Sequence, residues 1–108
     1  PTDDEGNLLA HLIALGEDVQ HLEAERTNLA VEHVGDGGSG SLRLFPAGTR
    51  GKARVFGRRV STWEFTDVDG VEVQVSLAVD GAGHLYELEV WKTNHGRLLS
   101  FPSFDDRA

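Results

Sequence analysis

Carboxylates in the second half of the chain are the residues whose spacing could support chemistry. They alternate with apolar residues, and a glutamine and a tryptophan fall in the same phase, giving the set Glu64, Glu72, Gln74, Glu87, Glu89 and Trp91. Since successive side chains of a strand point to opposite faces, we expect these six to stand together on the exposed face of a sheet. Catalysis of the glycosidase type needs two carboxylates with separated pKa values in a cleft, which an open sheet face does not offer. The alternation therefore favours a protein-binding surface, where acids attract a basic partner and Trp91 anchors it, or an ordinary solvated face.

Basic residues gather in residues 37 to 59, a segment with six bases and no acid. Five of these bases form the cluster Arg50, Lys52, Arg54, Arg58 and Arg59, for which the alternative function is binding an anionic ligand or nucleic acid. The segment does not match the phosphate-binding loop, because Pro46 replaces its first glycine and Ala53 replaces the hydroxyl residue that would reach Mg²⁺. The net charge of -8 repels phosphates over most of the surface, which argues against nucleic acid as the partner.

Other catalytic and metal-binding patterns are missing from the sequence. There is no cysteine, which excludes disulfides, thiolate metal sites and a cysteine nucleophile. The five histidines show neither His-x-x-x-His spacing nor a carboxylate at ligand spacing. No Gly-x-Ser-x-Gly motif marks an activated serine. We therefore expect a protein that is not an enzyme and that holds neither a metal nor a cofactor.

The carboxylates would be positioned by a β-meander from residue 60 to 92. Three alternating runs in this stretch are separated by turns rich in Asp and Gly, a pattern typical of consecutive antiparallel strands. In the middle run, apolar residues occupy every second position: Val71, Val73, Val75, Leu77 and Val79. These residues share the face opposite to the carboxylates, and that face must be covered.

An N-terminal helix from Asp3 to Leu15 is the expected cover. Thr2 and Glu5 have the spacing of a capping box. Leucines recur after them at helical spacing, and Gly16 stands where a helix commonly ends.

The remaining segments complete an α+β fold. We expect a short second helix around Asp18 to Glu25, and further strands at Asn28 to Val34, Ser41 to Phe45, Ala53 to Phe56 (an edge strand) and Arg97 to Phe101. The architecture is then a single antiparallel sheet of about five strands, with the N-terminal helix packed on one face.

Length and composition set the class of protein. A chain of 108 residues fits one domain, 1–108, and a hydrophobic fraction of 39% argues against disorder. Its longest apolar run falls far short of the roughly 20 residues that span a bilayer, and no basic start precedes an apolar segment. We therefore expect no membrane association and a cytoplasmic location.

Several segments resemble a small bacterial family of unknown function. They are DGGSGSL at 36–42, FTDVDGV at 65–71, SL at 76–77 and LYELEVWK at 85–92. The family pattern reads DGGMGSL, FxDxDGV, SLxxD and L-Y/F-ELDIWK, so this chain departs from it at Ser39 and Glu89. Such proteins resemble the small stand-alone proteins found beside toxin genes. The resemblance implies an immunity protein or antitoxin that neutralises a basic cognate toxin by occluding it.

Overall fold

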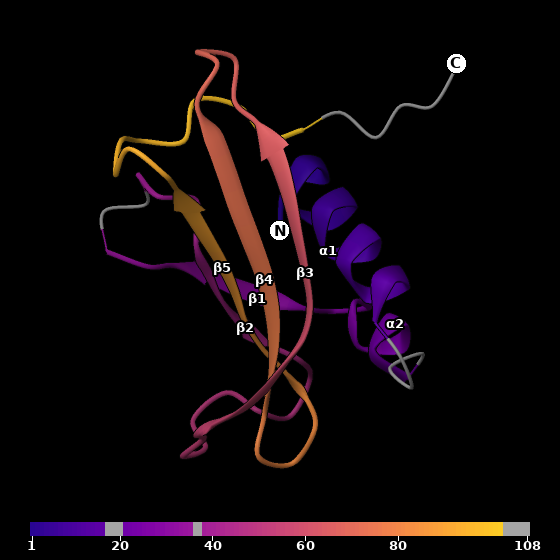
Figure 1. The fold of residues 1–108 in the computed structure, drawn as a ribbon. Helices are drawn as coiled ribbons and strands as arrows, with labels where there is room; N and C mark the ends of the chain where they lie inside the picture. Colours follow the sequence, from indigo (N-terminus) through magenta and orange to yellow (C-terminus); the bar gives the residue numbers. More distant parts are fainter. Residues whose placement is uncertain (17–20, 36–37, 103–108) are drawn as a thin grey trace.

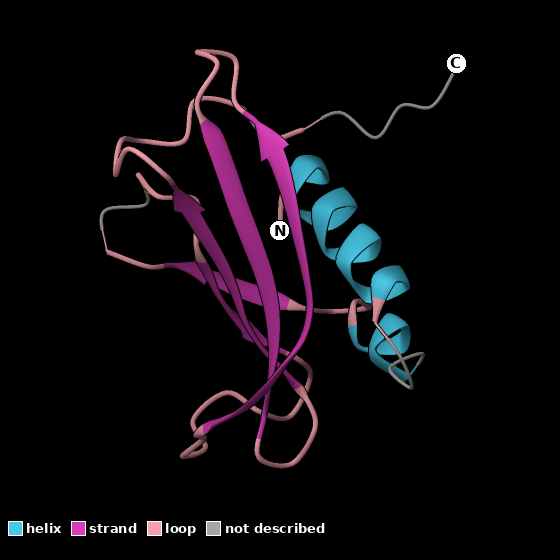
Figure 2. Cartoon of the chain, viewed as in Figure 1, coloured by secondary structure: helices cyan, strands magenta, loops and turns pink. Residues whose placement is uncertain are grey.

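A five-stranded antiparallel sheet organises the fold, and a helix lies along one of its faces (Figures 1 and 2). The computed structural model describes residues 1–16, 21–35 and 38–102. Within these residues the elements are α1 (Asp3–Leu15), α2 (His21–Glu25), β1 (Ala30–His33), β2 (Leu42–Phe45), β3 (Phe56–Thr66), β4 (Glu72–Asp80) and β5 (Leu85–Lys92). The strands are ordered β1-β2-β5-β4-β3, with antiparallel neighbours throughout. The predicted α+β fold, with one antiparallel sheet and an N-terminal helix on it, is confirmed.

The sequence of α1 contains both its start signal and its buried face. Thr2 N donates to Glu5 Oε1 at 2.9 Å, and Glu5 N donates to Thr2 Oγ1 at 3.1 Å, which completes the predicted capping box. The buried residues recur at helical spacing and lie on one side of the helix: Glu5, Leu8, Leu9, Leu12 and Ile13. The helix ends at Leu15, before Gly16, as predicted.

Strands β3, β4 and β5 form the predicted meander, with β4 in the middle. One side of β4 is fully buried, since Val73, Val75, Leu77 and Val79 are at most 3% exposed. These side chains form one core with the leucines of α1 and with the inward residues of β5. The core therefore lies between the helix and the sheet, and no helix of the described residues covers the opposite face (Figure 2).

Two of the predicted strands are not formed. The edge strand expected at Ala53 to Phe56 is absent, because Arg54 turns inward to pair with Asp80 and β3 begins only at Phe56. The last strand expected at Arg97 to Phe101 is also absent. The N–H groups of Leu99 and Ser100, which a strand would use for pairing, donate instead to the carboxylate of Asp67.

The other predicted elements are present in shorter form. The strands expected at 28–34 and 41–45 occupy Ala30–His33 and Leu42–Phe45. The second helix is formed at His21–Glu25, while residues 18–20 of that prediction lie outside the described residues.

Candidate functional site

The six residues predicted as a protein-binding surface lie together on the open face of the sheet, the face without α1. The register of the meander places three of them side by side across the strands, in what we call the Trp91 row: Glu64, Gln74 and Trp91. The neighbouring row, called the Glu89 row, consists of Thr62, Ser76 and Glu89. Glu87 lies opposite Ala78 beyond the Glu89 row, and Glu72 lies opposite Thr66 at the other end. The predicted grouping of these side chains on one face is therefore present.

The centre of this face is hollowed. One hollow of about 540 Å³ is lined by Thr62, Trp63, Glu64, Gln74, Val75 and Ser76. A second, of about 520 Å³, is lined by Ser41, Arg59, Thr62, Gln74, Ser76, Glu89, Val90 and Trp91. Both include the short side chains of Thr62 and Ser76, which lie between longer neighbours and leave space above the strands. Alternation of residue types predicts which residues share this face, but not that the face is concave.

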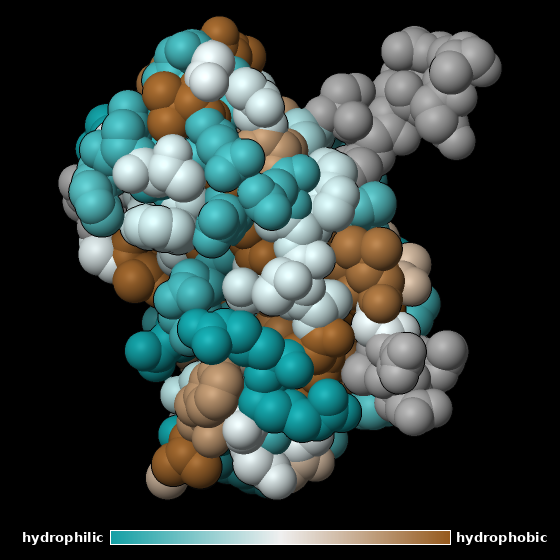
Figure 3. Space-filling model, viewed as in Figure 1, coloured by the Kyte–Doolittle hydropathy of each residue, from teal (hydrophilic) through white to brown (hydrophobic). Residues whose placement is uncertain are grey.

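Trp91 is the large apolar side chain of this surface. It is 45% exposed, and its ring lies 6.0 Å from the ring of His95, with the planes tilted by 58°. In Figure 3, hydrophilic and intermediate side chains dominate the surface over β4 and β5, with smaller hydrophobic patches between them. An exposed tryptophan among polar neighbours is a typical anchor of protein interfaces.

The charges of the open face are mixed. Arg59 Nη2 lies 3.3 Å from Glu89 Oε1, with both side chains more than half exposed, and Arg43 of β2 stands opposite Glu87. An exposed ion pair such as Arg59–Glu89 contributes little to stability. Among the described residues, the carboxylates of Glu64, Glu72 and Glu87 have no ion pair. Two of these unpaired acids, Glu64 and Glu72, lie toward the end of the sheet that holds Trp91, and Glu87 lies beyond the Glu89 row.

The predicted basic cluster is not gathered into one site. Three of its five members are paired with carboxylates of the chain itself: Arg50 with Glu32, Arg54 with Asp80 and Arg59 with Glu89. The other two line different hollows. Lys52 lines one of about 520 Å³ beside Thr49, Val55 and His84, and Arg58 lines one of about 410 Å³ beside His21.

Arg54 holds strands together. Its side chain is only 10% exposed, and Nε donates to Asp80 Oδ2 at 2.8 Å. Nη1 donates to Leu44 O at 2.8 Å, and Nη2 donates to Leu85 O. Burial acts to raise the pKa of Asp80, but hydrogen bonds from Arg54 and from backbone N–H groups outweigh it and keep the pKa below its ordinary value of 3.8. Arg54 thus connects β2, β4 and β5.

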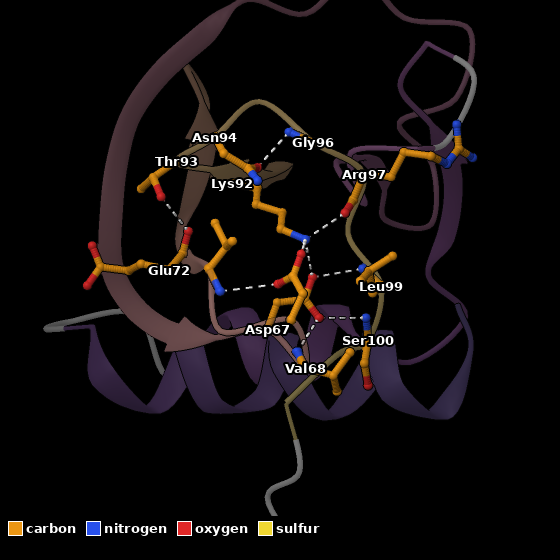
Figure 4. Close-up of polar contacts among 12 residues, drawn as sticks. Asp67, Val68, Glu72, Lys92, Thr93, Asn94, Gly96, Arg97, Leu99 and Ser100 are labelled. Atoms are coloured by element: carbon orange, nitrogen blue, oxygen red, sulfur yellow. Dashed lines mark hydrogen bonds and ion pairs between the residues drawn. The ribbon is translucent and has the colours of Figure 1, made fainter.

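A second buried ion network, which sequence reasoning missed, surrounds Lys92 (Figure 4). Lys92 Nζ donates to Asp67 Oδ2 at 2.9 Å, to Asp69 Oδ2 at 2.6 Å and to Arg97 O at 3.0 Å, so all three of its hydrogens are used. The Asp67 side chain is fully buried, and it also accepts from three backbone N–H groups: Val68, Leu99 and Ser100. The only sequence signals were the Asp-x-Asp-Gly turn and the lysine after Trp91.

The network is a structural anchor that favours the charged forms of its three side chains. Burial acts to raise the pKa of Asp67, but hydrogen bonds from Leu99 N and Lys92 Nζ keep it below its ordinary value of 3.8. The hydrogen bond from Lys92 likewise lowers the pKa of Asp69. Burial acts to lower the pKa of Lys92, but its hydrogen bonds to Asp69 and Asp67 raise it above its ordinary value of 10.5. With every polar atom engaged, the network joins the β3–β4 turn to residues 97–100.

These shifts predict acid sensitivity. The pKa values of Asp67, Asp69 and Asp80 are lower in the folded than in the unfolded chain, so the unfolded chain binds more protons. Their contribution to stability is present above the unfolded value of 3.8 and is lost as the pH falls through the folded values. Urea-unfolding midpoints measured from about pH 7 to pH 3 should fall below about pH 4. Equal midpoints over this range would contradict the assignment.

No group of three metal-ligating side chains lies close enough to hold an ion in the part of the chain that the structure describes. Across the same residues, no helix is both long enough and apolar enough to cross a membrane.

No significant similarity to a curated protein or to a solved structure is found. The family profile of a domain of unknown function, DUF6984, matches residues 1–102, which include α1, the whole sheet and the segment bound by Asp67. The expected membership of an uncharacterised family is therefore confirmed, and the chain belongs to the DUF6984 domain family.

Proposed function

We propose that this protein is a non-enzymatic binding module that holds a basic protein partner on its open sheet face. The observation that carries the proposal is the grouping of four glutamates around an exposed tryptophan on a hollowed surface without a covering helix. Acidic side chains attract a basic partner over several ångströms, and a partly exposed aromatic ring supplies apolar area to bury on contact. The opposite face is occupied by the core and cannot serve this role.

The partner class that fits this surface is a basic toxin, with the chain acting as its immunity protein or antitoxin. A protein of 108 residues with a net charge of -8 is suited to occluding a basic active site by binding over it. Anion binding by the Arg50 to Arg59 cluster has weaker support, because Arg50, Arg54 and Arg59 are already paired with acids.

The toxin assignment is tested by expressing the product of the adjacent reading frame in a bacterial host, with and without this chain. Growth arrest that is relieved by the chain, together with a complex that survives size-exclusion chromatography, is the expected result. A neighbouring product that is toxic but neither binds nor is neutralised would refute the immunity role.

The binding face is tested by charge reversal. We expect the double variant Glu87→Lys/Glu89→Lys to associate with that partner about tenfold more slowly at low salt, and the difference should shrink as salt is added. Association rates from surface plasmon resonance provide the measurement. The matched control is Asp4→Lys/Glu23→Lys, the same charge change at exposed positions of α1 and α2. If the control slows association as much as the sheet variant, net charge decides the rate and the face is not the interface.

A further inference from the structure

We propose that the Trp91 row recognises an arginine side chain of the partner, with the guanidinium stacked on Trp91 and paired with Glu64 above Gln74. This inference rests on the proposed function and names the group that the open face takes. Glu64 and Trp91 stand on β3 and β5 with β4 between them. Strands spaced by about 4.8 Å place the backbones of β3 and β5 about 10 Å apart, so a flat group that lies over the Gln74 side chain can reach both flanking side chains.

Gln74 stands between Glu64 and Trp91 and lines both hollows of this face, the one that includes Glu64 and the one that includes Trp91. No hydrogen bond engages the side chains of Glu64, Gln74 or Trp91 within residues 1–16, 21–35 and 38–102. A guanidinium carries five N–H donors and needs acceptors around its plane. The Glu64 carboxylate and the Gln74 amide oxygen are acceptors that this row offers beside the Trp91 ring.

The neighbouring row shows that a guanidinium suits this surface. Arg59 of the same chain lies against Glu89 at 3.3 Å, with side chains that are 58% and 52% exposed. The Trp91 row has the same kind of carboxylate and adds an aromatic wall, but no cation of the described residues pairs with Glu64. The acceptor and the ring are therefore both available to a cation from outside.

The chemistry of the row favours arginine over the other groups that a protein surface presents. A carboxylate or phosphate is repelled by Glu64 and by Glu89 beside it. An aliphatic side chain would bury the polar atoms of Gln74 without a hydrogen bond, which is costly. Lysine satisfies the charge but is compact and strongly hydrated, whereas arginine is planar, weakly hydrated and stacks on aromatic rings.

The test uses three capped tripeptides, Gly-Arg-Gly, Gly-Lys-Gly and Gly-citrulline-Gly, titrated into the whole ¹⁵N-labelled protein. Citrulline keeps the shape of arginine and removes its charge. We expect saturable shifts in the millimolar range for the arginine peptide at the Trp91 indole N–H and the Gln74 side-chain amide, weaker shifts for lysine and none for citrulline. Trp91→Ala and Glu64→Gln should each weaken arginine binding about two- to fivefold. The control Asp4→Asn, which removes one exposed acid from α1, should leave it unchanged.

Equal shifts with citrulline, no saturation with arginine, or an equal loss in Asp4→Asn would overturn the arginine assignment. A failure of the arginine assignment can be distinguished from a failure of the proposed function. Suppose that the Glu87→Lys/Glu89→Lys variant slows association with the toxin partner, but the arginine peptide does not bind at the Trp91 row. The open face is then the interface, and the arginine assignment is wrong. Suppose instead that the arginine peptide binds at the Trp91 row, but the Glu87→Lys/Glu89→Lys variant does not slow association with the partner. The row then binds arginine, and the proposed interface with the toxin is wrong.

Discussion

A Val75→Asp variant is expected not to hold the native fold. Val75 is 1% exposed, near the middle of β4, in the core shared by α1 and the sheet. A carboxylate there has no partner and must either stay charged in an apolar environment or take up a proton. The cost, together with the lost apolar burial, exceeds about 4 kcal/mol. Natural domains are stable by only about 5–15 kcal/mol, so a loss of this size removes most of the stability of a domain near the lower end of that range.

Circular dichroism and urea unfolding measure this effect, and Thr62→Asp serves as the control. Thr62 is exposed on the open face of the edge strand β3, so the same new carboxylate should cost about 1 kcal/mol or less. A soluble Val75→Asp variant that melts cooperatively near the wild-type temperature would contradict the placement of the core.

An Asp67→Ala variant is expected to lose about 3–5 kcal/mol of unfolding free energy. The substitution removes the acceptor of four donors: Lys92 Nζ and the N–H groups of Val68, Leu99 and Ser100. Lys92 Nζ is buried, and a buried donor that loses its partner carries the full cost of desolvation. Urea unfolding gives the magnitude. Hydrogen exchange gives the location, since Leu99 and Ser100 amides should lose protection before the strands of the sheet do.

Two further variants separate this charge network from a general packing defect. Asp69 is 34% exposed, against complete burial for Asp67, so Asp69→Ala should destabilise the fold clearly less. Adding Lys92→Met to Asp67→Ala removes a buried ammonium that has lost one of its two carboxylate partners, and should recover part of the lost stability. Strict additivity of the two substitutions would show that Asp67 and Lys92 are not coupled.

The elements that could be predicted are those whose signals are local. The capping box at Thr2 and Glu5 lies within one helical turn, and the buried residues of α1 follow from a period that the sequence displays directly. The face of β4 is equally local, because a strand alternates whatever it pairs with. For the same reason, the sharing of one face by Glu64, Gln74 and Trp91 was predictable once their strands were known to be neighbours.

The features that sequence reasoning missed depend on residues far apart in the chain. The segment 97–101 looked like a strand, but the N–H groups of Leu99 and Ser100 donate to Asp67, more than thirty residues earlier. Arg54 looked like part of a basic cluster, but it is neutralised by Asp80 on another strand. No spacing in the sequence predicts either pairing, because the partners come into contact only once the sheet has formed.

By itself, the sequence determined the helix, the meander, the face on which each side chain lies and the net charge, since each depends on neighbouring residues or on simple sums. Only the tertiary structure decided which of those charges remain available. It paired Arg50, Arg54 and Arg59 with acids, buried Asp67 against Lys92, and left Glu64 unpaired beside an exposed Trp91. The physical reason is that Coulomb attraction and hydrogen bonding act over a few ångströms, so they follow distances in space rather than positions in the chain.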